Sequence, residues 1–217
     1  MNIAKYFDHT CLKADASRED ISALCEEARR FGFKSVCVNP FFVPVAKALL
    51  KGSDVLVCTV VGFPLGQMTP RMKALEAADA VNLGADEVDM VQNVSMAKSH
   101  EFSFVEQEIR MVKNAIRGKT LKVILENCYL SSDEIEASSL AALRGGADFV
   151  KTSTGFGKGG AKESDVRIMK KAVGEKLEVK AAGGIKTAKD FYAMVNAGAT
   201  RIGSSHSVDI LKEINAD

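Results

Sequence analysis

The fold is indicated most clearly by the stretch Gly84-Ala85-Asp86-Glu87-Val88-Asp89-Met90-Val91. This stretch joins the end of a predicted helix to a predicted buried strand. Almost the same corner returns at Gly145-Gly146-Ala147-Asp148 and at Ala197-Gly198-Ala199-Thr200. A glycine just past the end of a helix adopts the left-handed conformation at little cost, and a strand then follows directly. The repeated corner therefore indicates βα units that all wind in one direction.

The same unit, a short apolar strand followed by a polar turn and an amphipathic helix, extends over the whole chain. We predict strands at residues 6–10, 35–39, 55–61, 87–92, 122–126, 148–152, 178–182 and 200–204. We predict helices near residues 17–30, 41–51, 70–83, 101–117, 132–144, 163–173, 187–197 and 206–214. Ser17 with Asp20, and Ser131 with Glu134, have the spacing of helix-capping pairs.

These repeated units predict an α/β protein with the (β/α)8 fold, a single TIM barrel that forms one domain over residues 1–217. The main alternative is an open, doubly wound parallel sheet. That fold usually carries a glycine-rich turn after its first strand, which this sequence lacks. We therefore favour the closed barrel.

Composition excludes several classes of protein. The chain is 47% hydrophobic and 26% charged, with a net charge of +1, which is typical of a soluble globular protein. This charge balance predicts neither a nucleic-acid nor a membrane partner. The first residues lack the apolar core of a signal peptide, and no apolar run is long enough for a transmembrane helix. The five cysteines are scattered and never form a C-x-x-C pair, so we expect a reducing, cytoplasmic location.

Polar side chains recur where strands of a parallel barrel should be apolar on both faces. Val88 and Met90 share one face of their strand, which leaves Asp89 on the other face with Glu87. The same alternation leaves a further set opposite the apolar face of its strands, namely Cys37, Glu126, Lys151 and Lys180. We expect the apolar faces to pack against the helices, so these polar side chains point into the barrel near the C-terminal ends of the strands, where this fold places its active sites.

Two inward lysines on neighbouring strands, with an inward aspartate, point to Schiff-base chemistry. A free lysine has a pKa of about 10.4 and is almost entirely protonated at neutral pH. A nearby ammonium and partial desolvation both lower a lysine pKa, and the neutral amine then attacks a carbonyl to form a carbinolamine and an imine. Asp89 is a candidate for the accompanying proton transfers. The alternative is a structural Lys–Asp pair, but a cluster of two such lysines favours function. The alternation alone does not choose between Lys151 and Lys180.

Three loops at the same end of the predicted barrel supply donors for an anion. They are Thr152-Ser153-Thr154-Gly155-Phe156-Gly157, Ala182-Gly183-Gly184-Ile185 and Gly203-Ser204-Ser205-His206. The last two follow the seventh and eighth predicted strands, where barrels often hold a phosphate on backbone N–H groups at helix N-termini. The stretch 155–160 lacks the spacing of a nucleotide P-loop. The three histidines form no cluster with metal-ligand spacing, so we expect no metal.

Several blocks resemble the signature stretches of the deoxyribose-phosphate aldolase family from end to end. They are Asp8-His9-Thr10, Val36-Cys37-Val38-Asn39-Pro40, the stretch 58–66, the stretch 84–91, the lysine-bearing stretch 146–155 and Lys180-Ala181-Ala182-Gly183-Gly184-Ile185. The chain departs from the family pattern at Ala182, at His206-Ser207 and at Glu126-Asn127-Cys128. These changes bear on affinity and phosphate geometry and leave the proposed chemical groups in place.

The resemblance implies a class I aldolase that reversibly cleaves 2-deoxy-D-ribose 5-phosphate to D-glyceraldehyde 3-phosphate and acetaldehyde, without metal or other cofactor. It matches Lys151 to the Schiff-base lysine, Lys180 to the lysine that tunes it, and Asp89 to the proton relay. Expected substrate and phosphate contacts are Thr152, Gly155, Gly183, Gly184, Gly203, Ser204 and Ser205, with Asp8 and Cys37 close by. It also makes a homo-oligomer, in the form of a dimer, the expected assembly.

Two other functions fit the same residues. One is another Schiff-base phosphosugar enzyme, such as a transaldolase-like barrel. The other is a non-catalytic phosphosugar-binding barrel that uses Lys151 and Lys180 as anion contacts. The three hypotheses differ in whether a covalent adduct forms and on which lysine.

Overall fold

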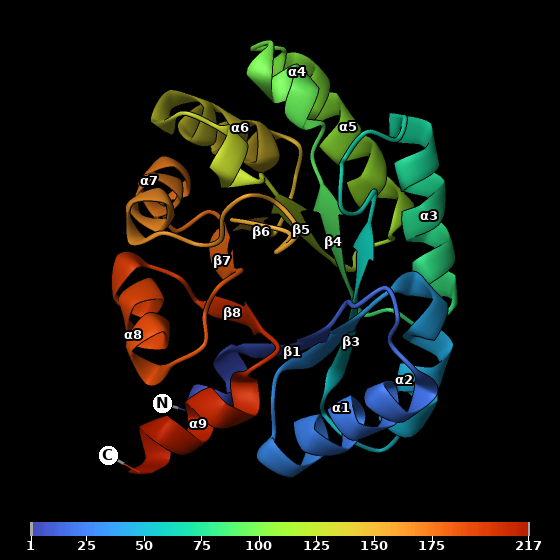
Figure 1. Cartoon of the computed structure of the whole chain (residues 1–217). Coiled ribbons are helices and arrows are strands. Elements are labelled where there is room, and N and C mark those ends of the chain that lie inside the picture. Colours follow the sequence, from blue (N-terminus) through green and yellow to red (C-terminus); the bar gives the residue numbers. More distant parts are fainter. Residues whose placement is uncertain (1, 217) are drawn as a thin grey trace.

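The computed structural model describes residues 2–216 and shows a closed barrel of eight parallel strands surrounded by helices (Figure 1). Each strand pairs with the next along the chain, and β1 pairs with β8 to close the barrel. The strands are β1 Phe7–Cys11, β2 Ser35–Val38, β3 Leu56–Val61, β4 Glu87–Val91, β5 Thr120–Ile124, β6 Phe149–Lys151, β7 Glu178–Ala182 and β8 Arg201–Ser204. The predicted (β/α)8 fold is confirmed.

Helices follow the strands around the outside of the barrel (Figure 1). They are α1 Arg18–Phe31, α2 Val43–Leu49, α3 Pro70–Asn82, α4 Val94–Lys98, α5 Phe102–Ala115, α6 Ser132–Arg144, α7 Glu163–Val173, α8 Ala188–Ala197 and α9 Ser207–Ala216. Short 3-10 turns lie at Ile3–Tyr6, Pro40–Phe42 and Asn127–Tyr129. The predictions did not include α4, which is a single short helix in the β4–α5 connection. None of the helices in the described residues is long and apolar enough to cross a membrane.

Local sequence signals account for where the helices begin and end. Ser17 and Ser131 each form a complete capping box with the acidic residue three positions later, as predicted. Gly84 and Gly198 adopt the left-handed conformation at their corners. At the remaining corner the left-handed residue is Gly146, whereas Gly145 keeps a helical backbone. A Cβ at Gly145 would lie 2.7 Å from a side-chain atom of Ile109. Gly145 thus serves helix packing and Gly146 makes the turn.

The barrel has an apolar outer layer and a polar interior. Side chains such as Val88, Met90 and Val123 are fully buried in the main apolar core between the strands and the helices. Strand β5 begins and ends two residues earlier than predicted. It stops before Glu126, whose backbone leaves the extended region with φ 57° and ψ 60°. The alternation correctly places Cys37, Asp89, Lys151 and Lys180 inside the barrel. It is wrong for Glu126, which lies beyond the end of the strand.

Candidate active site

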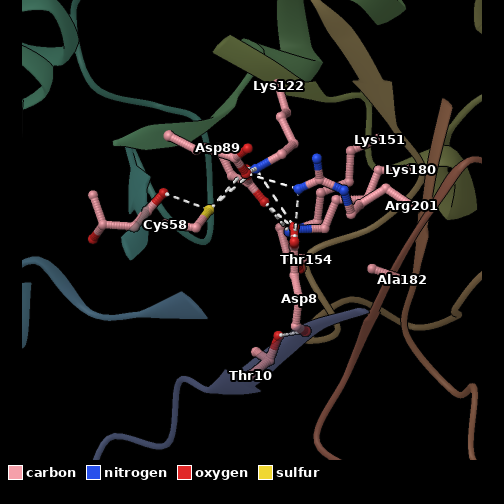
Figure 2. A network of polar contacts seen from close by, with 12 residues as sticks. Asp8, Thr10, Cys58, Asp89, Lys122, Lys151, Thr154, Lys180, Ala182 and Arg201 are labelled. Atoms are coloured by element: carbon pink, nitrogen blue, oxygen red, sulfur yellow. Dashed lines mark hydrogen bonds and ion pairs between the residues drawn. The ribbon is translucent and has the colours of Figure 1, made fainter. Parts of the chain in front are cut away.

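Asp89 lies at the centre of a network of buried charges inside the barrel (Figure 2). Its Oδ2 accepts hydrogen bonds from Lys151 Nζ at 2.8 Å and from Lys180 Nζ at 2.7 Å. Its Oδ1 accepts from Lys122 Nζ at 2.8 Å and from the Cys58 thiol at 3.2 Å. The structure therefore brings together the two lysines and the aspartate that the sequence singled out, and adds a third lysine.

Three of these side chains (Asp89, Lys122 and Lys180) join three others (Asp8, Glu87 and Arg201) in a closed ring in which carboxylates and cations alternate. Going around it, the ion pairs are Lys180–Asp8 (2.5 Å), Asp8–Arg201 (2.8 Å), Arg201–Glu87 (2.8 Å), Glu87–Lys122 (2.6 Å), Lys122–Asp89 (2.8 Å) and Asp89–Lys180 (2.7 Å). The ring draws its members from β1, β4, β5, β7 and β8. Lys151 lies outside the ring and touches it through Asp89. We call this set of six residues the charge ring.

Mutual attraction keeps five members of the charge ring ionised. Burial alone would raise the pKa of Asp8 and Asp89, but attraction to the surrounding cations outweighs it and holds both pKa values well below the usual range. Burial alone would lower the pKa of Lys122 and Lys180, but the facing carboxylates raise both instead. The pKa of Arg201 is raised for the same reason. Lys180 is therefore a permanent cation at neutral pH.

Lys151 is the lysine that reaches an open cavity. A cavity of about 640 Å³ lies over the C-terminal end of the barrel, and of the three inward lysines in the described chain Lys151 alone lines it. Lys122 and Lys180 are completely buried beneath. Access to a ligand thus separates Lys151 from Lys180, which strand alternation did not.

The predicted phosphate loops line the same cavity. Gly155, Gly183, Gly184, Gly203, Ser204 and Ser205 all contribute to its wall. Gly183 and Gly184 have φ values of 90° and 79°, a conformation that side chains other than glycine rarely adopt and that exposes backbone N–H groups. Ser204 and Ser205 follow β8 and precede α9. A single cavity therefore joins Lys151 to the loops that the sequence predicts to hold a phosphate.

The structure places other predicted contacts away from the cavity. Thr152 is fully buried, and its hydroxyl donates to the carbonyl of Ala182 at 3.0 Å and accepts from its amide at 3.1 Å, so it links the ends of two strands. Cys37 is buried in a small apolar cluster with Cys58. Asp8 lies in the charge ring below the cavity floor. Thr152 and Asp8 therefore both have their side-chain polar atoms already engaged within the protein.

Sequence reasoning missed Lys122 and Arg201, although the signal was present. Leu121 and Val123 form the apolar face of β5, which leaves Lys122 on the inner face by the same alternation that identified Lys151. On β8, Ile202 lies on the apolar face, which leaves Arg201 on the inner face. Both cations also lie near the ring of Phe149, at 6.0 Å for Lys122 Nζ and 5.1 Å for Arg201 Cζ. The structure therefore adds two cations to the predicted site.

Two groups of donor atoms in the described residues are close enough together to hold a metal ion. They are Cys37, Cys58 and Asp89, and Asp8, Cys58 and Glu87. Their carboxylate oxygens already accept from ammonium or guanidinium groups, which bring positive charge to the places where a cation would bind. These donor sets do not fit a divalent metal without displacing the charge ring.

Comparison with known proteins identifies the family to which the chain belongs. The profile of the DeoC/LacD family aldolases matches residues 2–212. A deoxyribose-phosphate aldolase from Caldanaerobacter subterraneus subsp. tengcongensis is 54% identical over 98% of this chain and 94% of its own length, and one from Staphylococcus saprophyticus is 52% identical over 100% and 99%. A tetrameric deoxyribose phosphate aldolase from Aeropyrum pernix superposes with a TM-score of 0.91 at 33% identity, over 98% of this chain and 91% of that one. With the barrel, the buried lysines and the phosphate loops in place, the chain belongs to the DeoC/LacD family of aldolases.

Proposed function

We propose that this protein is a deoxyribose-phosphate aldolase, a lyase that reversibly cleaves 2-deoxy-D-ribose 5-phosphate to D-glyceraldehyde 3-phosphate and acetaldehyde. The observation that carries the proposal is the position of Lys151, at the floor of a cavity whose rim is formed by Gly183, Gly184, Ser204 and Ser205. A phosphate held at the rim directs the aldehyde end of an open-chain sugar toward the lysine.

The reaction begins with attack of the neutral Lys151 amine on the C1 aldehyde, which forms a carbinolamine. Loss of water gives an iminium ion, and loss of the proton from the C3 hydroxyl breaks the C2–C3 bond and releases glyceraldehyde 3-phosphate. The two carbons left on Lys151 form an enamine, which takes a proton at C2 and is hydrolysed to acetaldehyde and free lysine. Asp89, 2.8 Å from Lys151 Nζ, is the group placed to relay protons at the nitrogen.

The direct assay is cleavage of 2-deoxyribose 5-phosphate with detection of both aldehydes. The proposed function requires release of both products, with a much lower kcat/KM for 2-deoxyribose lacking the phosphate. Binding of the phosphosugar without release of products would favour a non-catalytic phosphosugar-binding barrel. Turnover restricted to longer ketose phosphates would favour a transaldolase-like enzyme.

Ser205→Asp is expected to raise KM for the phosphorylated substrate about 100-fold while kcat changes little. Ser205 is exposed and lines the cavity, so the new carboxylate repels the phosphate without touching the buried charges. Initial rates over a range of substrate concentrations measure this split. Ser205→Ala, which adds no charge, is the matched control. An equal KM in the two variants would place the phosphate elsewhere.

We also propose a homodimer located in the cytoplasm. The outer face of α3 and the loop before it carry exposed apolar side chains at Met68, Met72 and Leu75, with 38%, 47% and 52% of their surface accessible. Such a stripe supports burial against a second copy. The five unpaired cysteines support a reducing compartment. Light scattering that gives the mass of a monomer at micromolar concentration would contradict the dimer.

A further inference from the structure

We infer that the whole charge ring, including residues that never touch the substrate, sets how readily Lys151 gives up its proton. This inference deepens the proposed function and rests on it. It assigns positioning roles to Lys122 and Arg201, which the sequence did not associate with the site, and to Glu87, which shares a face of β4 with Asp89. Each acts on Lys151 through the balance of charge below the cavity floor.

The charge ring is electrically balanced, and Lys151 is an additional charged group beside it. The charge ring contains three carboxylates (Asp8, Glu87, Asp89) and three cations (Lys122, Lys180, Arg201), and each member contacts one of opposite sign on either side. Its net charge is zero when all six are ionised. Lys151 adds a seventh charged group without adding a carboxylate. Its ion-pair partner within residues 2–216 is Asp89 Oδ2, which it shares with Lys180.

An ammonium on Lys151 is therefore the uncompensated charge of the cluster. A neutral amine there leaves the ring balanced, and the neutral amine is the form that attacks a carbonyl. If the ring loses a cation, the remaining negative charge stabilises a protonated Lys151. If it loses a carboxylate, the excess positive charge disfavours that proton. The sign of the effect follows from the charge that is removed, and not from the identity of the residue.

Burial makes this coupling strong. Asp8, Asp89, Lys122 and Lys180 have no accessible surface, and Glu87 has 2%. Water therefore screens these charges poorly, and the electrostatic interaction of each with other charges extends over a longer distance than on a surface. The pKa values of Asp8 and Asp89 are held down and those of Lys122, Lys180 and Arg201 are held up, which keeps these five groups charged near neutral pH.

Two cysteines face the cluster from the remaining strands, whereas Glu126 lies beyond the end of β5. Cys37 on β2 and Cys58 on β3 lie next to Asp89 and the lysines, and burial raises the pKa of Cys58, which stays a thiol. Glu126, after β5, is held by the amide and hydroxyl of Thr154. Variants of the charge ring leave these three groups in place, so a change in Lys151 behaviour reports on the ring.

The test is the pH dependence of imine formation at Lys151 in two single variants of opposite charge. Lys122→Met leaves the ring with one excess negative charge, and we expect the acidic limb of the profile to move up by about one pH unit. Glu87→Gln leaves one excess positive charge, and we expect the limb to move down by a similar amount. The measurement is the initial rate of the borohydride-trapped acetaldehyde adduct on Lys151 at each pH, quantified by mass spectrometry.

The double variant Lys122→Met/Glu87→Gln restores the neutral ring, and its acidic limb should return to the parental position. Lys73→Met is the matched control. Lys73 forms a completely buried ion pair with Glu108 at 2.7 Å between α3 and α5, outside the barrel. Its loss removes a buried cation and lowers stability, but the limb should stay in place. Circular dichroism verifies folding, and Arg201→Met replaces Lys122→Met if the latter does not fold.

The inference is supported if the acidic limb moves in opposite directions in the two single variants and returns to the parental position in the double variant. The inference would be overturned if the acidic limb moved in the same direction in both single variants or did not move at all. An equal movement of the limb in Lys73→Met would also overturn it. Failure of the unmodified protein to form any adduct on Lys151 would overturn the proposed function instead. The two failures are therefore distinguishable in one set of experiments.

Discussion

Lys151→Ala is expected to yield a folded protein whose retro-aldol activity is reduced by about four orders of magnitude or more. The substitution removes the only group that forms a covalent bond to the substrate in the proposed reaction. The remaining charge ring is neutral without Lys151, so its internal ion pairs stay intact. The measurements are kcat/KM for 2-deoxyribose 5-phosphate and thermal unfolding by circular dichroism.

Lys158→Ala provides the control for loss of a lysine near the site. Lys158 lies in the β6–α7 loop over the ring of Tyr129, at 5.2 Å, and is exposed. We expect its activity to stay within about threefold of the parent, because a single exposed charge contributes little. Retention of substantial aldolase activity in Lys151→Ala would contradict covalent catalysis at this residue.

Lys180→Leu is expected to lower kcat by about two to three orders of magnitude and to move the acidic limb of the pH–rate profile upward. Lys180 is a buried cation that bonds both Asp8 and Asp89. Its removal leaves excess negative charge beside Lys151, which favours the ammonium form and so reduces the fraction of reactive amine at a given pH. Breaking a buried ion pair also costs about 3–5 kcal/mol of stability, so rates should be measured at a temperature where the variant is folded.

Lys180→Arg keeps the positive charge and separates charge from shape. We expect its acidic limb to stay near the parental position even where packing lowers the rate. A profile that is unchanged in Lys180→Leu would show that Lys180 does not influence Lys151 electrostatically. Activity loss in both variants without any pH shift would assign Lys180 a packing role.

Much of the fold was predictable because short-range chemistry determines it. The capping pairs at Ser17 and Ser131, the glycine corners at Gly84 and Gly198, and the alternation in β4 each appear in a few consecutive residues. Errors occurred where tertiary contacts decide the outcome. Glu126 adopts a left-handed backbone while its carboxylate holds Thr154, and this ends β5 earlier than its apolar pattern suggests.

The candidate site was predictable in part. The inward positions of Asp89, Lys151 and Lys180 follow from alternation, and the structure confirms that they meet. The pairing of Asp89 with Lys122, and of Arg201 with Asp8 and Glu87, depends on how the barrel closes, which brings together strands far apart in sequence. The choice of Lys151 depends on where the cavity opens, a property of loops from several units. The alternation within a single strand predicts neither the pairing of these charges nor the position of the cavity.

Borohydride trapping with acetaldehyde, followed by peptide mapping, directly tests whether Lys151 is the nucleophile. An imine is reduced to a stable secondary amine, so the modified residue identifies the nucleophile. We predict a single two-carbon adduct on Lys151, lost in Lys151→Ala and absent without borohydride. No adduct, or an adduct on Lys180 in the unmodified protein, would contradict it.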